Sequence, residues 1–414
     1  MTATPAPVGI DGWGPLDRTG LTPIDGGVTA VAGIRAGGVV SGVKASGKPD
    51  LALIAADEPA GAAAVTTTNL VKASACLLTD RNTADGRAQA ILINAGNANV
   101  CTPDGAAHTQ RLADATARHL GVATADVLVM STGVIGVPLP VDRIEGALPA
   151  VVADLAPDGA DRAATAMLTT DTVTKQVAFE VADEDGNRCV VAGMAKGVGM
   201  IEPAMATLLV VLTTDAPLGR PVLQQLLRKS VDVTFNRISV DGDGSTSDTV
   251  AILATGAATR PPNLDAVTRG LHAVCADLAH AVVSDGEGAS RVAAITVHGA
   301  SSEDDAETLA RAIASSLLVR AAIHGADPNW GRILMAMGTA GVAFEPDRVS
   351  VSCGGVTVCR FGVATAFDRG QAAVAMDRPQ VAIDVDLNAG PASATMLTCD
   401  LTPEYVRFNA EYTT

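Results

Sequence analysis

One peptide bond, Ala206–Thr207, separates a glycine-rich segment from an apolar run. A lysine, two glycines and a proline lie within residues 196–203, and residues 208–212 are all apolar. Such a run predicts a buried strand with a threonine at its head. Cleavage of the bond would give Thr207 a free α-amine, with a pKa near about 8, beside its own hydroxyl. That amine could act as the general base for the hydroxyl as a nucleophile.

An uncleaved chain gives the same segment a purely structural explanation, a glycine-rich turn that leads into a core strand. Cleavage instead requires the Thr207 hydroxyl to attack the Ala206 carbonyl, and the resulting ester is then hydrolysed. The products would be residues 1–206 and 207–414, packed together. Gly197, Gly199 and Pro203 would permit the close backbone approach that this reaction needs. The segment alone leaves both explanations open.

The sequence gives little support for a histidine or cysteine catalytic site or for a metal site. The six histidines form no HxxxH pair, and the seven cysteines are scattered without a CxxC motif, so we expect reduced, mostly buried thiols and no metal site. Residues 241–252 begin like a calcium loop, but Thr246 and Ile252 occupy the positions that need Gly and Glu. No phosphate-binding glycine loop of the Walker type is present. A hydroxyl nucleophile would therefore need another base, which a threonine amine supplies.

Composition narrows the class of protein. A chain of 414 residues predicts two or three domains. Its formal net charge of −16 argues against nucleic acid or an anionic membrane as a partner. No apolar run approaches the ~20 residues that span a bilayer. Residues 1–27 contain four prolines and no signal-peptide pattern, which predicts a loose tail and a cytoplasmic protein.

The residues that could take part in catalysis or binding are distributed among predicted strands and helices. Apolar runs predict strands at residues 51–55, 90–94, 127–130 and 294–298, and alternation predicts another at 381–387. Helical spacing covers 141–155, a segment from Pro221, and 267–282, and a Ser302 cap predicts a helix over 305–320. Gly354–Gly355 predicts a hairpin. We expect a layered α/β fold with mixed sheets and a boundary near residues 284–292.

The chain resembles the ornithine acetyltransferase (glutamate N-acetyltransferase) family of arginine biosynthesis, which are self-cleaving N-terminal-nucleophile enzymes. The resemblance begins at the segment 196–207 and extends over almost the whole chain after about residue 25. It is carried by "GGVVSGVKASGKPDLALI" at 37–54, "INAGNANVCT" at 93–102, "STGVIG" at 131–136, "MLTTDTVTK" at 167–175, "FNRISVDGD" at 235–243, "DGEGASR" at 285–291, "GADPNWGR" at 325–332 and "FNAEYTT" at 408–414. So many ordered motifs are far more specific than one short pattern.

The resemblance implies an αββα sandwich of the N-terminal-nucleophile type with a smaller C-terminal α/β domain. Four segments are expected: a tail at 1–27, a catalytic domain at 28–285, a second domain at 286–400, and a segment at 401–414 that returns to the active site. It also implies acetyl transfer from N2-acetyl-L-ornithine to L-glutamate by ping-pong kinetics through an acetyl-threonine. No cofactor is implied, and acetyl-CoA is a further acetyl donor in bifunctional members.

The resemblance also implies a role for each site residue. Thr207 is the nucleophile, and Thr132 and Gly133 stabilise the oxyanion. Lys196 suits the α-carboxylate of the substrate, and Glu287 suits the side-chain ammonium of ornithine. The other substrate-binding residues implied are Thr169, Asn409 and Thr414.

Each of these residues has a structural alternative when it is taken alone. Residues 131–133 would be an ordinary turn after a strand, Lys196 a solvated surface lysine, Glu287 an exposed turn acid, and Thr169 a strand or cap threonine. The last residues of a chain are normally frayed, so Asn409 and Thr414 would be disordered. The chain departs from the usual family pattern at Ser247, Gly244, Thr66 and Leu317.

The expected partners are the two small substrates and the protein's own fragments. An α/β pair would assemble as a heterotetramer of two α and two β chains, with no nucleic acid and no membrane. Three alternatives stay open: a self-cleaving aminopeptidase or amidase that uses water as acceptor, an acetyltransferase paralogue of secondary metabolism, and an unprocessed, non-catalytic binding or scaffold paralogue. Trp330 and Arg332 are expected to shape the second domain or an interface.

Overall fold

A nine-stranded mixed sheet forms the larger part of the molecule. The computed structural model describes residues 17–202 and 208–411. The strands of this sheet are β1 (Leu21–Pro23), β2 (Ile34–Val39), β3 (Leu51–Thr66), β4 (Arg87–Asn97), β5 (Val127–Val134), β6 (Lys175–Ala182), β7 (Arg188–Lys196), β8 (Leu209–Thr214) and β10 (Thr249–Ala254). Their order is β1-β6-β7-β8-β10-β3-β4-β5, and β2 pairs with β3.

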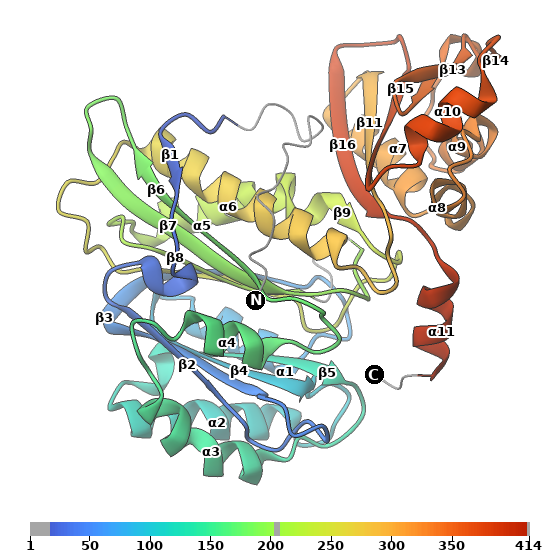
Figure 1. The fold of residues 1–414 in the computed structure, drawn as a ribbon. Helices are drawn as coiled ribbons and strands as arrows, with labels where there is room; N and C mark the ends of the chain where they lie inside the picture. Colours follow the sequence, from blue (N-terminus) through green and yellow to red (C-terminus); the bar gives the residue numbers. More distant parts are fainter. Residues whose placement is uncertain (1–16, 203–207, 412–414) are drawn as a thin grey trace.

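The long strand β3 joins two halves of this sheet. Its first part pairs with β2 and β4, while its second part pairs with β10. Side chains alternate along a strand, so Ala52 and Ile54 face one core while Leu51 and Leu53 face another. The core that Ala52 and Ile54 enter also takes side chains from β7, β8 and β10. The two halves therefore lie face to face (Figure 1). Many members of this core are alanines, which suits a chain with only 2% aromatic residues.

Helices cover both outer faces of the two sheet halves. One face packs against α1 (Ser74–Asn82), α2 (Gly105–Leu120) and α3 (Val141–Ala153), and the other against α5 (Arg220–Val233) and α6 (Leu264–Ser284). The short α4 (Ala160–Met167) packs against β2 and β3. The layers are thus α, β, β and α (Figure 1), as expected from the resemblance. No helix in the described part of the chain is long and apolar enough to cross a membrane.

A second, seven-stranded sheet lies beside the sandwich (Figure 1). Its strands are β9 (Ile238–Ser239), β11 (Val292–Ala300), β12 (Ser350–Cys353), β13 (Val356–Arg360), β14 (Val363–Ala364), β15 (Gln380–Asp386) and β16 (Ala392–Cys399), in the order β14-β13-β12-β15-β11-β16-β9. Its helices are α7 (Glu303–Ala314), α8 (Leu317–His324), α9 (Trp330–Gly338) and α10 (Arg369–Met376), followed by α11 (Pro403–Glu411). Short 3₁₀ helices are η1 (Gly27–Ala30), η2 (Thr124–Asp126), η3 (Phe235–Arg237) and η4 (Pro346–Arg348).

Most of the predicted elements are confirmed, and one is wrong. The predicted strands lie in β3, β4, β5, β8, β11 and β15, and Gly354 and Gly355 have positive φ in the predicted hairpin. The helix predicted over 305–320 is instead two helices, α7 and α8. Ser302 caps α7 as expected, but the side chain of Ser316 accepts the backbone N–H of Val319 and starts α8. A serine that bonds to the backbone in this way favours a new helix start over a continuous helix.

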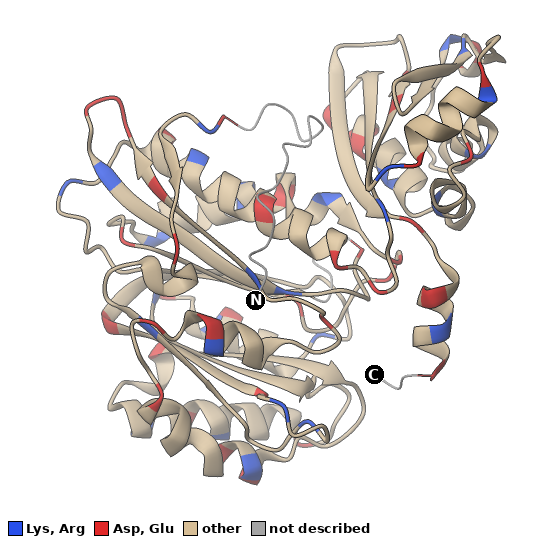
Figure 2. Cartoon of the chain, viewed as in Figure 1, with Lys and Arg blue, Asp and Glu red and all other residues tan. Residues whose placement is uncertain are grey.

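The cysteines are placed as the sequence predicts. All seven cysteines are free and only Cys101 is exposed, which confirms the mostly buried thiols. Figure 2 shows Lys and Arg scattered among Asp and Glu along the coloured ribbon. Trp330 packs partly buried against the core of the second sheet.

Candidate active site

The expected nucleophile and its cleavage bond lie outside the described residues, as does Thr414. The residue that follows Thr207 is described and is firmly held. Leu208 is buried, its N–H donates to the Asp248 Oδ1 at 2.8 Å, and its carbonyl accepts from the Thr249 N–H at 3.0 Å. Asp248 is itself buried, and burial raises the pKa of its carboxyl group well above its ordinary range. The main chain at Leu208 is therefore fixed beside the starts of β8 and β10.

Thr132 and Gly133 lie within β5, where they pair with the glycine-rich end of β4. Gly133 has a φ of 128°, and a Cβ at this position would lie 2.3 Å from the Gly96 carbonyl carbon. Only glycine fits such a backbone. The alternative of an ordinary turn after the strand is wrong, because β5 continues to Val134. The oxyanion role of this pair stays a prediction.

Lys196 is the last residue of β7 and only 2% exposed. Its Nζ donates to the Thr132 Oγ1 at 3.3 Å. In the register of β7 with β8 it pairs with Leu209, two residues beyond Thr207. Burial lowers the pKa of its ammonium, and the nearby Asp171 carboxylate opposes this effect. The alternative of a solvated surface lysine is therefore wrong, and the side-chain nitrogen of Lys196 is held beside the start of β8.

Glu287 occupies the turn after α6 and is partly buried with two side-chain partners. Thr170 Oγ1 donates to its Oε1 at 2.9 Å, and Asn409 Nδ2 donates to its Oε2 at 3.0 Å. A Cβ at Gly199 would lie 2.6 Å from the same Oε2, which explains a glycine there. The alternatives of an exposed turn acid and of a disordered Asn409 are wrong.

The expected substrate hydroxyl, Thr169, is the neighbour of the residue that contacts Glu287. Its backbone N–H donates to the Asp171 Oδ2 at 3.0 Å, and its hydroxyl lies 3.5 Å from the same oxygen. Sequence reasoning missed Thr170, although the adjacent threonines of "MLTTDTVTK" offered the signal.

A buried ion-pair cluster connects the loops of the site, and sequence reasoning missed it. Lys175 is fully buried, and its Nζ donates to the Asp171 Oδ1 at 2.8 Å and to the Asp285 Oδ2 at 2.6 Å. Asp171 also accepts the Gly197 N–H at 2.8 Å. Burial alone would raise the pKa of Asp171, but Lys196 and Lys175 together hold it well below its ordinary range. The cluster fixes three segments around the candidate site: 169–175, 196–199 and 285–287.

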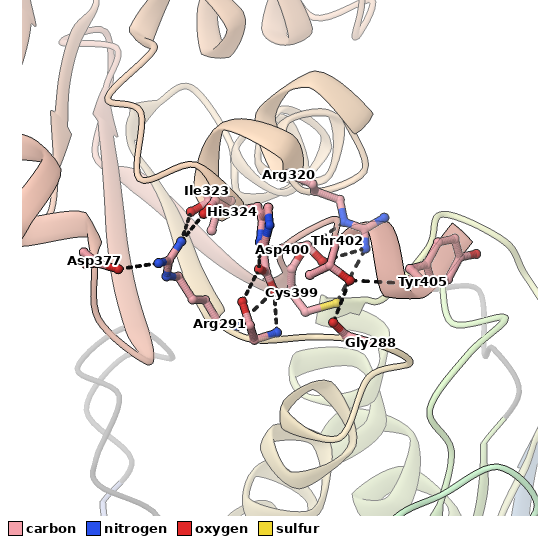
Figure 3. A network of polar contacts seen from close by, with 11 residues as sticks. Gly288, Arg291, Arg320, Ile323, His324, Asp377, Cys399, Asp400, Thr402 and Tyr405 are labelled. Atoms are coloured by element: carbon pink, nitrogen blue, oxygen red, sulfur yellow. Dashed lines mark hydrogen bonds and ion pairs between the residues drawn. The ribbon is translucent and has the colours of Figure 1, made fainter. Parts of the chain in front are cut away.

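The segment that leads into the C-terminal helix α11 is docked against Gly288, in the turn that follows α6 (Figure 3). The buried Asp400 carboxylate accepts the N–H groups of Ser290 and Arg291 at 2.8 and 2.9 Å, and His324 Nδ1 lies 2.8 Å from it. The Thr402 hydroxyl donates to the Gly288 carbonyl at 2.7 Å. These contacts account for the position of Asn409 at Glu287.

The four departures from the family pattern occupy different surroundings. Thr66 and Ser247 are buried, Thr66 Oγ1 donates to Asp80, and Ser247 lies next to Asp248 in the chain. The Gly244 carbonyl accepts from Asn69. Leu317 is 60% exposed at the start of α8.

Known proteins are similar to this chain over almost its whole length. Residues 35–414 match the model of the ArgJ family. The "Arginine biosynthesis bifunctional protein ArgJ" of Thermosynechococcus vestitus is 44% identical, with 94% of this chain and 99% of the relative covered. The protein of the same name from Thermobifida fusca is 45% identical, with 94% and 100% covered.

Two solved structures are also similar in sequence. The ArgJ crystal structure from Bacillus halodurans is 36% identical with a TM-score of 0.47, and the match covers 49% of this chain and 98% of that one. The structure of ornithine acetyltransferase complexed with ornithine from Mycobacterium tuberculosis is 42% identical with a TM-score of 0.41, and the match covers 44% and 98%.

Proposed function

The chain belongs to the ArgJ family, and we propose that it is the acetyltransferase that moves acetyl from N2-acetyl-L-ornithine to L-glutamate. The products are L-ornithine and N-acetyl-L-glutamate. The observation that carries this proposal is the convergence of Lys196 with Thr132 beside the start of β8, directly after Thr207. The strand β8, which begins two residues after Thr207 in the chain, thus lies beside a buried lysine and, through Thr132, beside a glycine-rich strand end.

The proposal begins with self-cleavage. The Thr207 hydroxyl attacks the Ala206 carbonyl carbon, the Ala206–Thr207 C–N bond breaks, and the acyl group moves to oxygen as an ester. Water then hydrolyses the ester, which leaves a carboxylate on residue 206 and a free amine on Thr207. The anchoring of Leu208 by Asp248 supports this step, because it fixes the residue that follows Thr207 in the chain.

Acetyl transfer then takes two half-reactions. With its own amine as base, the Thr207 hydroxyl attacks the acetyl carbonyl of N-acetylornithine, and ornithine leaves with the proton. Glutamate, through its α-amine, then removes the acetyl group from Thr207. The Thr132 hydroxyl and the Gly133 N–H would stabilise both oxyanions, where one donor is commonly worth about 10²–10³ in rate.

The proposed substrate contacts pair groups of opposite charge. Lys196 would bind the α-carboxylate, which both substrates share, and Glu287 would bind the side-chain ammonium of ornithine. Thr170 and Asn409 already hold the Glu287 carboxylate, so it is oriented before the substrate arrives. Thr169 and Thr414 complete the proposed substrate-binding set.

Three further properties belong to the proposal. Relatives are named as bifunctional, so acetyl-CoA would be a second donor and glutamate the acceptor in both reactions, with no resident cofactor. The two fragments would form an α/β pair that assembles into a heterotetramer. The enzyme would act in the cytoplasm.

Product analysis tests the proposed activity. Purified protein is incubated with N-acetylornithine, with and without glutamate, and ornithine, N-acetylglutamate and acetate are measured. The proposal expects glutamate to accelerate ornithine release and N-acetylglutamate to form in equal amount. Release of acetate at a rate independent of glutamate would instead identify a hydrolase that uses water as acceptor.

A further inference from the structure

Lys44, which is not among the expected substrate-binding residues, lies near the ends of β4 and β5, as Lys196 does. Lys44 is in the loop between β2 and β3, and the buried Asp50 carboxylate organises this loop by accepting the N–H groups of Ser41 and Lys44 at 2.5 and 2.8 Å. The Lys44 Nζ donates to the Pro49 carbonyl at 2.6 Å and lies 3.5 Å from the Ala166 carbonyl. The ammonium is therefore held between its own loop and the end of α4.

The stem of Lys44 packs on the strand that supports the candidate oxyanion pair. A Cβ on Gly96 would lie 3.1 Å from the Lys44 Cγ, and Gly96 pairs in register with Gly133. Lys196 contacts the preceding residue of that strand, Thr132. The stem of Lys44 and the side-chain nitrogen of Lys196 thus approach the same short stretch of β4 and β5.

Within residues 17–202 and 208–411, neither of these two ammonium groups forms an ion pair, whereas Lys175 pairs with two carboxylates. Burial lowers the pKa of Lys44 to about 8, the Asp50 and Asp171 carboxylates oppose this shift, and Lys196 and Lys48 add to it. A carboxylate bound at the Lys44 ammonium would offset the cost of its burial and its repulsion by Lys196.

The segment 166–171 runs from this lysine to the candidate carboxylate. Its Ala166 end lies at the Lys44 Nζ, its Thr170 hydroxyl donates to Glu287, and Thr169 lies between them. This segment therefore has the Lys44 side-chain nitrogen at one end and the Glu287 carboxylate at the other.

The two proposed substrates differ in the sign of their side-chain charge. Ornithine carries an ammonium, which suits Glu287, and glutamate carries a carboxylate, which Glu287 would repel. We propose that Lys44 binds the side-chain carboxylate of the acceptor glutamate, while Glu287 binds the side-chain ammonium of the donor. This inference rests on the proposed acetyl transfer at the same site.

Steady-state kinetics of three variants tests the inference. In ping-pong kinetics the kcat/KM for each substrate reports its own half-reaction, so donor and acceptor effects separate. Lys44→Met should lower kcat/KM for glutamate by about tenfold or more and change that for N-acetylornithine by less than about threefold. Lys44→Arg should restore most of the glutamate value. Lys48→Met, an exposed lysine of the same loop, is the matched control and should behave as wild type.

Acceptor choice gives a second readout that a merely structural role would not move. Wild type should prefer glutamate to glutamine, and Lys44→Met should lose most of this preference. An unchanged glutamate-to-glutamine ratio, or equal losses in both half-reactions, would overturn the inference. If wild type forms no N-acetylglutamate from N-acetylornithine and glutamate, the proposed function itself fails, whatever Lys44 does.

Discussion

Removal of the Lys175 ammonium should destabilise the sandwich strongly. The Asp171 and Asp285 side chains are 0% and 6% exposed, so Lys175→Met removes the ammonium group that both buried carboxylates contact. Breaking a buried ion pair by removing one partner commonly costs about 3–5 kcal/mol. Asp171 keeps the N–H groups of Gly197 and Thr169, and we therefore expect the lower end, about 3 kcal/mol.

Thermal unfolding followed by circular dichroism measures this cost. At roughly 2 °C per kcal/mol for a domain of this size, Tm at neutral pH should fall by roughly 6 °C. Arg111→Met is the control, because Arg111 is 47% exposed in its contacts with Asp142 and Glu145. A surface pair of this kind is worth about 0–1 kcal/mol, so its Tm should fall by at most roughly 2 °C.

The pH dependence of the Tm difference between wild type and Lys175→Met tests the direction of the predicted effect. The lowered pKa of Asp171 means that its native contacts contribute stability above its unfolded pKa of about 3.9, and this contribution is lost as the pH falls through the native value. In Lys175→Met, protonation of the buried carboxylates relieves their cost. The Tm gap to wild type should therefore be largest at neutral pH and shrink below about pH 4. A Tm loss no larger than that of Arg111→Met, or a gap that widens in acid, would refute the reasoning.

Three other predictions concern activity. Gly133→Ala places a Cβ 2.3 Å from the Gly96 carbonyl carbon, so kcat should fall by about 10²–10³-fold while the circular dichroism spectrum is retained; an active variant would exclude Gly133 from the oxyanion site. Asn409→Ala removes one donor to Glu287 and should raise KM for N-acetylornithine about three- to tenfold; an unchanged KM would contradict this contact. The pKa of Lys44 is about 8, and its ammonium is lost as pH rises through this value, so kcat/KM for glutamate should fall above about pH 8 relative to that for N-acetylornithine. Lys44→Arg should remove this relative fall, and its persistence in the variant would assign it to another group.

The local sequence pattern predicts most of the helices and strands. The apolar runs of β3, β4, β5 and β8 and the helical spacing of α3, α5 and α6 are confirmed, because burial on one face leaves a periodic trace. The break between α7 and α8 was missed, since the apolar spacing continues across it and only the Ser316 cap interrupts it.

The candidate site could be predicted only in part. Lys196, Thr132, Glu287 and Asn409 were named through motif resemblance, and their contacts with one another follow from strand register and from the docking of α11, which no local pattern encodes. The Lys175 cluster was missed for the same reason, because its second carboxylate is 110 residues away in the chain.

The central claim is that Thr207 cleaves its own chain and is then the nucleophile. A denaturing gel with intact-mass measurement and N-terminal sequencing of purified wild type, Thr207→Ser and Thr207→Ala tests it most directly. Wild type and Thr207→Ser should each give two fragments, 1–206 and 207–414, the second beginning at residue 207. Thr207→Ala should remain whole and inactive. A single full-length band from active wild type, or cleavage of Thr207→Ala at the same bond, would contradict the claim.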